Sequence, residues 1–266
     1  MPTVFADDRP INVETTGDDR RPALLLLNPL GTTIDVWEPL LATLASHNWV
    51  IRFDIRGHGR FAESTPIEPY SVDDLTRDAI AVLDALEVTE ANVLGASLGG
   101  LVGLQLAASY PDRVGRLILA ATAPVLGPDY WWDRTIETVQ SGGIEAAADH
   151  LERVLFSEAF RTALPTRVAE QRAMLVSTPD ASYVAGARAI QDANLGPVAA
   201  GIRASTLLIS GEDDPVLAHH PPTDLLSAIT DSEAVMVSGA GHRVLVEQAE
   251  VLGPLICDFL TDPDGR

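Results

Sequence analysis

The sequence predicts a mostly parallel α/β sheet flanked by helices, with a further block of helices inserted as a cap. Short apolar runs alternate along the chain with segments of helical periodicity, which is the pattern of a parallel α/β sheet. A glycine-rich turn at residues 95–99 joins one such run to one such helix. Between about residues 125 and 200 the chain shows several helical patterns and no good strand. We therefore expect the core at residues 1–124 and 201–266 and the cap at residues 125–200.

Length and composition suit a single domain with an inserted lid. The chain has 266 residues, of which 46% are hydrophobic, enough to bury a large core. Its formal net charge is -20, because 38 acidic residues stand against 18 basic ones, all of them arginine. Such a charge repels phosphate backbones and anionic membrane surfaces. We therefore expect a small-molecule partner, and neither nucleic acid nor a membrane.

The sequence also bears on cellular location. Residues 1–9 include acidic side chains and no apolar core of signal-peptide length. No stretch reaches the ~18 continuous apolar residues of a membrane span. The one cysteine, Cys257, lies in an apolar helical pattern and cannot form an internal disulfide. A cytoplasmic protein is the expectation.

Strands and helices alternate in the first part of the core. Alternating Ile11, Val13 and Thr15 predict a strand pair within residues 3–16, with its turn near Asp7-Asp8. Ser71 is a helix cap, followed by acidic residues and by an apolar face that reaches Leu86. Purely apolar runs predict buried parallel strands. In chain order we expect strand 23–27, helix 37–45, strand 49–53, the helix after Ser71, strand 92–94 and helix 98–109.

Helical patterns fill the expected cap, and strands resume after it. Further strands are expected at residues 117–121, 206–209 and 233–237, followed by a closing helix at residues 246–260. The segment 61–69 contains two prolines and is expected to be a surface loop. A helical insertion lies over the carboxyl ends of the strands, where open sheets bind ligands. Within the cap, periodicity predicts helices at residues 134–139, 144–156, 167–176 and 183–190.

The turn Gly95-Ala96-Ser97-Leu98-Gly99 has the pattern of a nucleophile elbow. In a G-x-S-x-G turn between strand and helix, the serine adopts a strained backbone conformation and its hydroxyl is presented at the sheet edge. The close backbone leaves room only for glycine two residues to either side. The alternative is that Ser97 is simply a helix N-cap in a glycine-rich turn. Residues elsewhere in the chain are needed to distinguish a nucleophile from a helix cap.

A base and an acid for this serine follow in later loops. His242 comes after the last expected strand, and Asp213 and Asp214 come after the strand before it. Loops after parallel strands meet at the carboxyl edge of the sheet, so Ser97, an aspartate and His242 should lie together. Asp214 is preferred as the acid, because it precedes a proline at the fourth position of its turn. Asp213 remains the alternative.

Nucleophilic catalysis at a carbonyl also needs two backbone N–H donors for the oxyanion. One is expected from Leu98, directly after the serine, and the other from Leu30, because the neighbouring Pro29 has no N–H. The Asn28 side chain is expected to tie this loop down. The turn around His58 is interpreted as structural, since glycines flank it. No spacing of histidines, cysteines and acids suggests a metal, and no cofactor is expected.

Taken together, these residues resemble the α/β-hydrolase superfamily, and most closely its 3-oxoadipate enol-lactonases. The similarity covers essentially the whole chain. The motifs that carry it are Asn28–Thr32, the turn Asp54–Gly59, the elbow Gly95–Gly100 and the cap segment Trp132–Val139 with the glycine pair after it.

The resemblance implies hydrolysis of a small, carboxylate-bearing enol-lactone through an acyl-enzyme, with Ser97, Asp214 and His242 as the triad. It also implies a cation for the acid, for which Arg134 is the candidate, beside Trp131 and Trp132. The alternative is that Arg134 pairs with a neighbouring acid on the cap surface and that the tryptophans only pack the cap.

Several positions near the expected site depart from the family pattern. Pro29 replaces a serine, Arg60 and Phe61 follow the glycine turn, and Arg243 directly follows His242. Leu245 and Ala249 also replace a polar residue and a proline. The triad could therefore serve another acyl substrate. The alternatives are a general carboxylesterase, a carbon-carbon bond hydrolase, a cofactor-free perhydrolase, or a homologue that binds a ligand without turnover.

Overall fold

The centre of the molecule is a seven-stranded, mostly parallel sheet in the order β3-β5-β4-β6-β7-β8-β9. A computed structural model describes residues 4–6, 9–64, 67–218 and 223–261. β3 is antiparallel to β5, and all other neighbours in this sheet are parallel. The strands are β3 (Val13–Thr16), β4 (Ala23–Leu27), β5 (Trp49–Phe53), β6 (Ala91–Ala96), β7 (Val114–Ala120), β8 (Ser205–Gly211) and β9 (Ser232–Val237). The predicted fold class is thus confirmed.

A short ribbon of β1 (Val4–Ala6) and β2 (Arg9–Ile11) stands apart from the sheet as an antiparallel pair. The expected opening strands are therefore present, but they form three short pieces, of which only β3 joins the sheet. The turn expected at Asp7-Asp8 lies outside the described residues.

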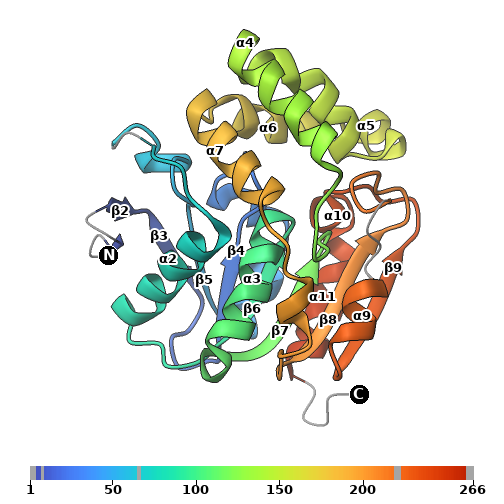
Figure 1. Ribbon diagram of the computed structural model, residues 1–266. Coiled ribbons are helices and arrows are strands. Elements are labelled where there is room, and N and C mark those ends of the chain that lie inside the picture. Colours follow the sequence, from blue (N-terminus) through green and yellow to red (C-terminus); the bar gives the residue numbers. More distant parts are fainter. Residues whose placement is uncertain (1–3, 7–8, 65–66, 219–222, 262–266) are drawn as a thin grey trace.

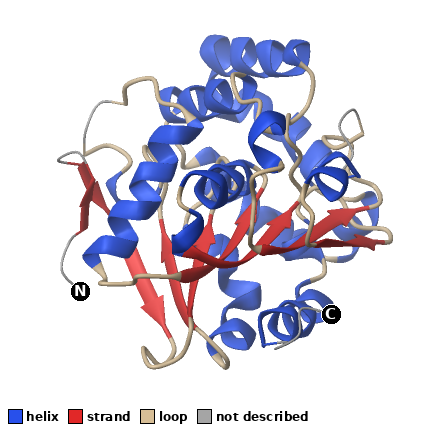
Figure 2. Cartoon of the chain, turned by 60° about the horizontal axis from the view of Figure 1, so that its bottom comes forward, coloured by secondary structure: helices blue, strands red, loops and turns tan. Residues whose placement is uncertain are grey.

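Helices cover both faces of the sheet (Figure 2). The apolar strand β4 shows why, since Leu25 and Leu27 pack into one cluster while Leu24 and Leu26 pack into another. The first cluster includes α2 and α3, and the second includes α1 and α11. The bounds of these helices are α1 (Glu38–Ala45), α2 (Val72–Ala85), α3 (Leu98–Ser109), α9 (Thr223–Ala228), α10 (Val244–Glu247) and α11 (Ala249–Thr261), with 3-10 turns η1 (Ile34–Trp37), η2 (Gly59–Phe61) and η3 (Pro111–Arg113).

Five helices lie between β7 and β8 in the sequence, and α4 to α7 lie above the sheet in Figure 1. Three of them, α4, α6 and α7, contact loops that follow strands of the sheet. A methyl group added at Gly31, after β4, would lie 2.6 Å from Leu175 and 3.3 Å from Tyr183. The Arg243 N–H, after β9, donates to the Leu155 carbonyl at 2.9 Å. The helices are α4 (Asp129–Leu155), α5 (Glu158–Ala163), α6 (Pro165–Val176), α7 (Asp180–Gln191) and α8 (Gly196–Ala199).

Some boundaries differ from those expected. The two helical patterns at 134–139 and 144–156 form one helix, α4, kinked at Gly143, where φ is 77°. The closing helix is divided at Gln248 into α10 and α11, because the backbone there leaves the helical region. β7 begins at Val114, three residues before the expected strand. Within the described residues, no helix is both long and apolar enough to cross a bilayer.

Candidate active site

Ser97 lies at the sharp turn between β6 and α3. Its backbone φ is 53°, in the left-handed region that non-glycine residues rarely adopt. A Cβ added at Gly95 would lie 2.2 Å from the Gly99 carbonyl oxygen, and one added at Gly99 would lie 1.9 Å from that of Leu27. The glycines are therefore required by the close approach of three backbone segments, which is the steric reason for the elbow pattern. The Ser97 side chain makes no capping hydrogen bond, contrary to the helix-cap alternative.

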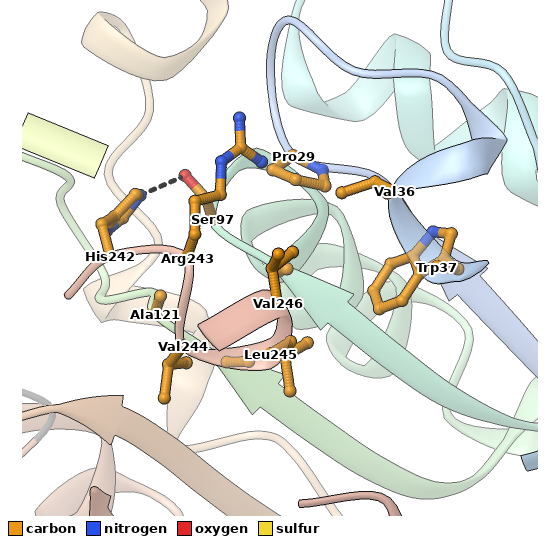
Figure 3. A pocket seen from close by; sticks show the side chains of 12 residues that line it. Pro29, Val36, Trp37, Ser97, Ala121, His242, Arg243, Val244, Leu245 and Val246 are labelled. Carbon is orange, nitrogen blue, oxygen red and sulfur yellow. Dashed lines mark hydrogen bonds between the residues drawn. The ribbon is translucent and has the colours of Figure 1, made fainter. Parts of the chain in front are cut away.

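His242 and Asp214 complete a buried chain of hydrogen bonds with this serine. The His242 Nε2 atom lies 2.9 Å from Ser97 Oγ, and Nδ1 lies 2.7 Å from Asp214 Oδ2. Figure 3 shows the His242 ring directed at the hydroxyl. Because a carboxylate only accepts hydrogen bonds, Nδ1 is the donor toward Asp214, and Nε2 is left to accept the serine proton. All three side chains are buried.

The structure places Asp214, and not Asp213, beside the histidine. The second oxygen of Asp214 accepts the backbone N–H groups of Val216 at 2.8 Å and Leu217 at 3.4 Å. These bonds fix the carboxylate so that its other oxygen faces His242. Asp213 is exposed, and its N–H donates to the Ala240 carbonyl, which holds the turn.

The loop after β4 is held by its neighbours on several sides. The buried Asn28 side chain donates to the Phe53 carbonyl at 3.1 Å and accepts from the Trp37 indole at 2.6 Å, so its anchoring role is confirmed. The Gly31 N–H donates to His58 Nε2 at 3.2 Å. These bonds hold the loop on both sides of Leu30, the expected oxyanion donor. Leu98, the other expected oxyanion donor, is the first residue of α3, where N–H groups lack an acceptor within the helix.

His58 is a neutral, structural histidine. Its Nε2 accepts the Gly31 N–H, so Nδ1 carries the proton and donates to the Arg56 carbonyl at 2.9 Å. Burial lowers the pKa of His58 to about 4. The turn from Asp54 to Gly59 therefore supports the loop after β4.

A comparison with known proteins decides the family. The family model described as the alpha/beta hydrolase fold matches residues 22–249. The chain is an α/β-hydrolase. Over 248 residues it is 33% identical to 3-oxoadipate enol-lactonase 2 of Acinetobacter baylyi, covering 93% of this chain and 92% of that protein.

Solved structures agree with this assignment. The enol-lactonase from Burkholderia xenovorans LB400 superposes with a TM-score of 0.93 at 32% identity, covering 98% of this chain and 100% of the other. A hydrolase from Pseudomonas aeruginosa PA01 gives a TM-score of 0.90 at 34% identity, with 97% of both chains covered. The α/β-hydrolase is therefore an enzyme of the hydrolase class that resembles enol-lactonases, as its motifs predict.

Trp131, Trp132 and Arg134, all on α4, lie outside the lining of the pocket that contains Ser97. α4 turns Trp132 inward, where its indole donates to the Leu126 carbonyl, and Trp131 meets it edge to face at 4.6 Å. Arg134 lies on the exposed side of this helix because the buried positions are Trp132, Thr135, Ile136 and Val139. Their spacing leaves position 134 facing away from the core.

Arg134 and Trp131 line a second pocket, which is basic. Its other basic lining residues are His150 and Arg153. Burial and the nearby charges of Arg153 and Arg134 lower the pKa of His150. These four residues could not be grouped from the sequence, because the kink at Gly143 brings the two halves of α4 together.

Glu247 is a site residue that the sequence reasoning missed. One carboxylate oxygen accepts the Gly241 N–H and the Ser157 N–H, both at 3.1 Å, and the other accepts the Ser157 hydroxyl at 2.6 Å. Glu247 thus holds the backbone beside His242 and ties it to the start of α5. Burial raises its pKa, although these hydrogen bonds oppose the shift. The only signal in the sequence is an acid five residues after the histidine.

The pocket beside Ser97 is mainly apolar. Figure 3 shows Ser97, His242 and Arg243 on one side and Val36 and Trp37 on the other. Its remaining lining consists of Pro29, Ala96, Ala120, Ala121, Val244, Leu245 and Val246. The lining thus combines the candidate nucleophile, one cation and a hydrocarbon surface. That combination suits a small acyl compound better than a polar polymer.

Proposed function

We propose that this α/β-hydrolase cleaves a small ester or lactone through an acyl-enzyme, with Ser97 as nucleophile, His242 as base and Asp214 as its orienting acid. The observation that carries the proposal is the continuous chain of buried hydrogen bonds through these three side chains. Enol-lactones come first among the substrates, on the strength of relatives that bear this name at 32% and 33% identity.

The proposed reaction begins with proton transfer from Ser97 Oγ to His242 Nε2 as Oγ bonds to the substrate carbonyl carbon. The carbonyl electron pair moves onto its oxygen, which accepts hydrogen bonds from the N–H groups of Leu30 and Leu98. Collapse of this intermediate breaks the bond to the leaving oxygen, which takes the proton from His242. In a lactone, that oxygen stays attached to the acyl group.

Water completes the proposed cycle. His242 removes a proton from the water as its oxygen attacks the acyl carbon, and the Ser97 oxygen leaves with that proton. The products are the free acid and the restored enzyme. Asp214 keeps the histidine in the tautomer that both steps need.

We further propose that residues 125–200 act as a cap on the core formed by residues 1–124 and 201–266. Arg134, with Trp131 and Trp132 beside it, would then belong to the outer approach to the site and not to the pocket at Ser97. A basic pocket on a chain of net charge -20 favours the approach of an acidic substrate.

The test compares 3-oxoadipate enol-lactone with neutral p-nitrophenyl hexanoate, in the wild type and in Ser97→Ala. We expect the wild type to favour the lactone and the variant to lose on the order of 10⁴- to 10⁶-fold in kcat on both substrates. A Ser97→Ala enzyme with undiminished activity would disprove the mechanism. Preference for the neutral ester would retain the mechanism and replace the lactonase assignment with an esterase.

A further inference from the structure

Arg243 is a charged side chain in the wall of the reaction pocket. It directly follows His242 and lines the same pocket as Ser97 (Figure 3). Only 6% of the residue is exposed. Its backbone N–H donates to the carbonyl of Leu155 at the end of α4, so the backbone at this residue is fixed from the cap side.

The guanidinium of Arg243 uses little of its hydrogen-bonding capacity. Nη2 donates to the Leu30 carbonyl at 3.2 Å, while Nε and Nη1 are buried without a hydrogen-bond partner. Tyr183 on α7 is the neighbour that interacts with it electrostatically. Within residues 4–6, 9–64, 67–218 and 223–261, no carboxylate forms an ion pair with Arg243.

Two other buried arginines of the chain have the carboxylate partners that Arg243 lacks among the described residues. The Arg52 side chain is 7% exposed and pairs with both Glu14 and Glu38. Arg56 is equally buried and pairs with Asp78, itself buried. The fold therefore supplies carboxylates to arginines that it buries for structural reasons.

Leaving a buried cation without an anion is energetically unfavourable. Burial lowers the pKa of Arg243 to about 10, and a group with this pKa is still protonated at neutral pH. The charge is thus kept in the pocket although the surrounding protein does not neutralise it. An anion that enters with the substrate would supply the missing partner, because a guanidinium binds carboxylates through its planar fork of N–H donors.

We propose that Arg243 binds a free carboxylate on the acyl side of the substrate and so makes the enzyme selective for half-esters and lactones of dicarboxylic acids. This inference rests on the proposed function for the position of the reacting carbonyl. The aliphatic lining, with Val36, Leu245 and Val246, accommodates the hydrocarbon between carbonyl and carboxylate. The contact with Leu30 places the bound carboxylate next to the expected oxyanion donor.

A purely structural role for Arg243 makes different predictions. If its purpose were to hold the Leu30 carbonyl, its loss would impair every substrate equally and would lower stability. If it binds substrate, its loss should affect acidic substrates selectively. Removing an unpaired buried charge should then leave the melting temperature unchanged or raise it.

The experiment uses mono-p-nitrophenyl adipate and p-nitrophenyl hexanoate, which share the leaving group and differ in the terminal carboxylate. Arg243→Met should lower kcat/KM for the adipate ester by about 10- to 150-fold relative to the hexanoate ester, the range for a hydrogen bond to a charged group. Arg243→Lys should recover part of the loss, because it restores the charge without the planar fork. Equal losses on both esters would overturn the proposal.

Arg167→Met is the matched control, because it removes one positive charge from an exposed ion pair with Glu170 on α6. It should leave the ratio between the two esters unchanged, which separates a local contact from the effect of net charge. Arg134→Met tests the competing cation. Selective loss of the adipate ester in Arg134→Met, with none in Arg243→Met, would also overturn the proposal.

A binding measurement separates this proposal from the proposed mechanism. Calorimetry with Ser97→Ala, which cannot form the acyl-enzyme, should show monomethyl adipate binding more tightly than dimethyl adipate. The double variant Ser97→Ala/Arg243→Met should lose that preference by about 10- to 150-fold in Kd. Selective binding without turnover in the wild type would refute only the mechanism. Turnover without charge selectivity would refute only the role of Arg243.

Discussion

The neutral His58 should make the stability of this protein depend on pH. In the folded state its Nε2 accepts the Gly31 N–H, so a proton added to Nε2 would place two donors against each other. The unfolded chain has no such restriction and takes up the proton near pH 6.5. Between that value and the folded pKa of about 4, the unfolded state binds more protons, so acid favours unfolding. The contribution is fully present above pH 6.5 and is lost as pH falls toward 4.

The size of the effect follows from the two pKa values. One pH unit in this window corresponds to about 1.36 kcal/mol for one proton, and the whole window to about 3 kcal/mol. Between pH 8 and pH 5 only the upper part of the window is crossed. The free energy of unfolding should therefore fall by about 2 kcal/mol on account of His58.

Urea unfolding of the wild type and His58→Gln, at pH 8 and pH 5, isolates this contribution. Burial raises the pKa values of Asp54 and Glu247, so protonation of these two groups stabilises the folded state as the pH falls. Both proteins share this contribution, so it cancels in the difference between wild type and His58→Gln. His58→Gln should be less stable than the wild type at pH 8, and the gap should shrink by about 2 kcal/mol at pH 5. The exposed His47→Gln is the matched control and should retain the wild-type dependence. A gap between wild type and His58→Gln that stays constant within about 0.5 kcal/mol would refute the reasoning.

Two further predictions concern the candidate site. Asp214→Asn should lower kcat on the order of 10⁴-fold in ester hydrolysis, whereas the exposed Asp213→Asn should change it less than about threefold, and a reversed order would reassign the acid. Gly99→Ala should lower the free energy of unfolding by at least about 3 kcal/mol, because its Cβ would lie 1.9 Å from the Leu27 carbonyl oxygen. Gly103→Ala on the same helix meets its nearest atom at 3.4 Å, so urea unfolding should show it near wild-type stability.

Much of the fold could be predicted from sequence because its local signals agree with the tertiary structure. β4 is apolar at all five positions because helices cover both of its faces, and α2 begins directly after Ser71, the N-cap that the sequence predicts. Other boundaries depend on distant contacts. The split between α10 and α11 falls where Glu247 binds Ser157 at the start of α5, a contact between residues 90 apart in the chain.

The candidate nucleophile, base and acid could be predicted for a topological reason. Each follows a strand of a parallel sheet, and the carboxyl ends of neighbouring strands share one edge. Residues 97, 214 and 242 are therefore expected at the same edge of the sheet, independently of the sequence between them. The choice between Asp213 and Asp214 is of another kind, because it depends on which of two adjacent side chains faces inward. In the structure Asp214 faces His242, and the N–H groups of Val216 and Leu217 hold its carboxylate there.

The cation is the point at which sequence reasoning was weakest. Resemblance favours Arg134, but on a helix the direction of a side chain follows from which neighbouring positions are buried, and here those positions turn Arg134 outward. Arg243 looks in the sequence like a mere departure from a family pattern. The proposed role of Arg243 depends on which of its guanidinium N–H groups have hydrogen-bond partners. Only a structure supplies that information. A charge that the protein buries and leaves unneutralised beside the candidate nucleophile therefore favours Arg243 over Arg134 as the proposed cation for the acid.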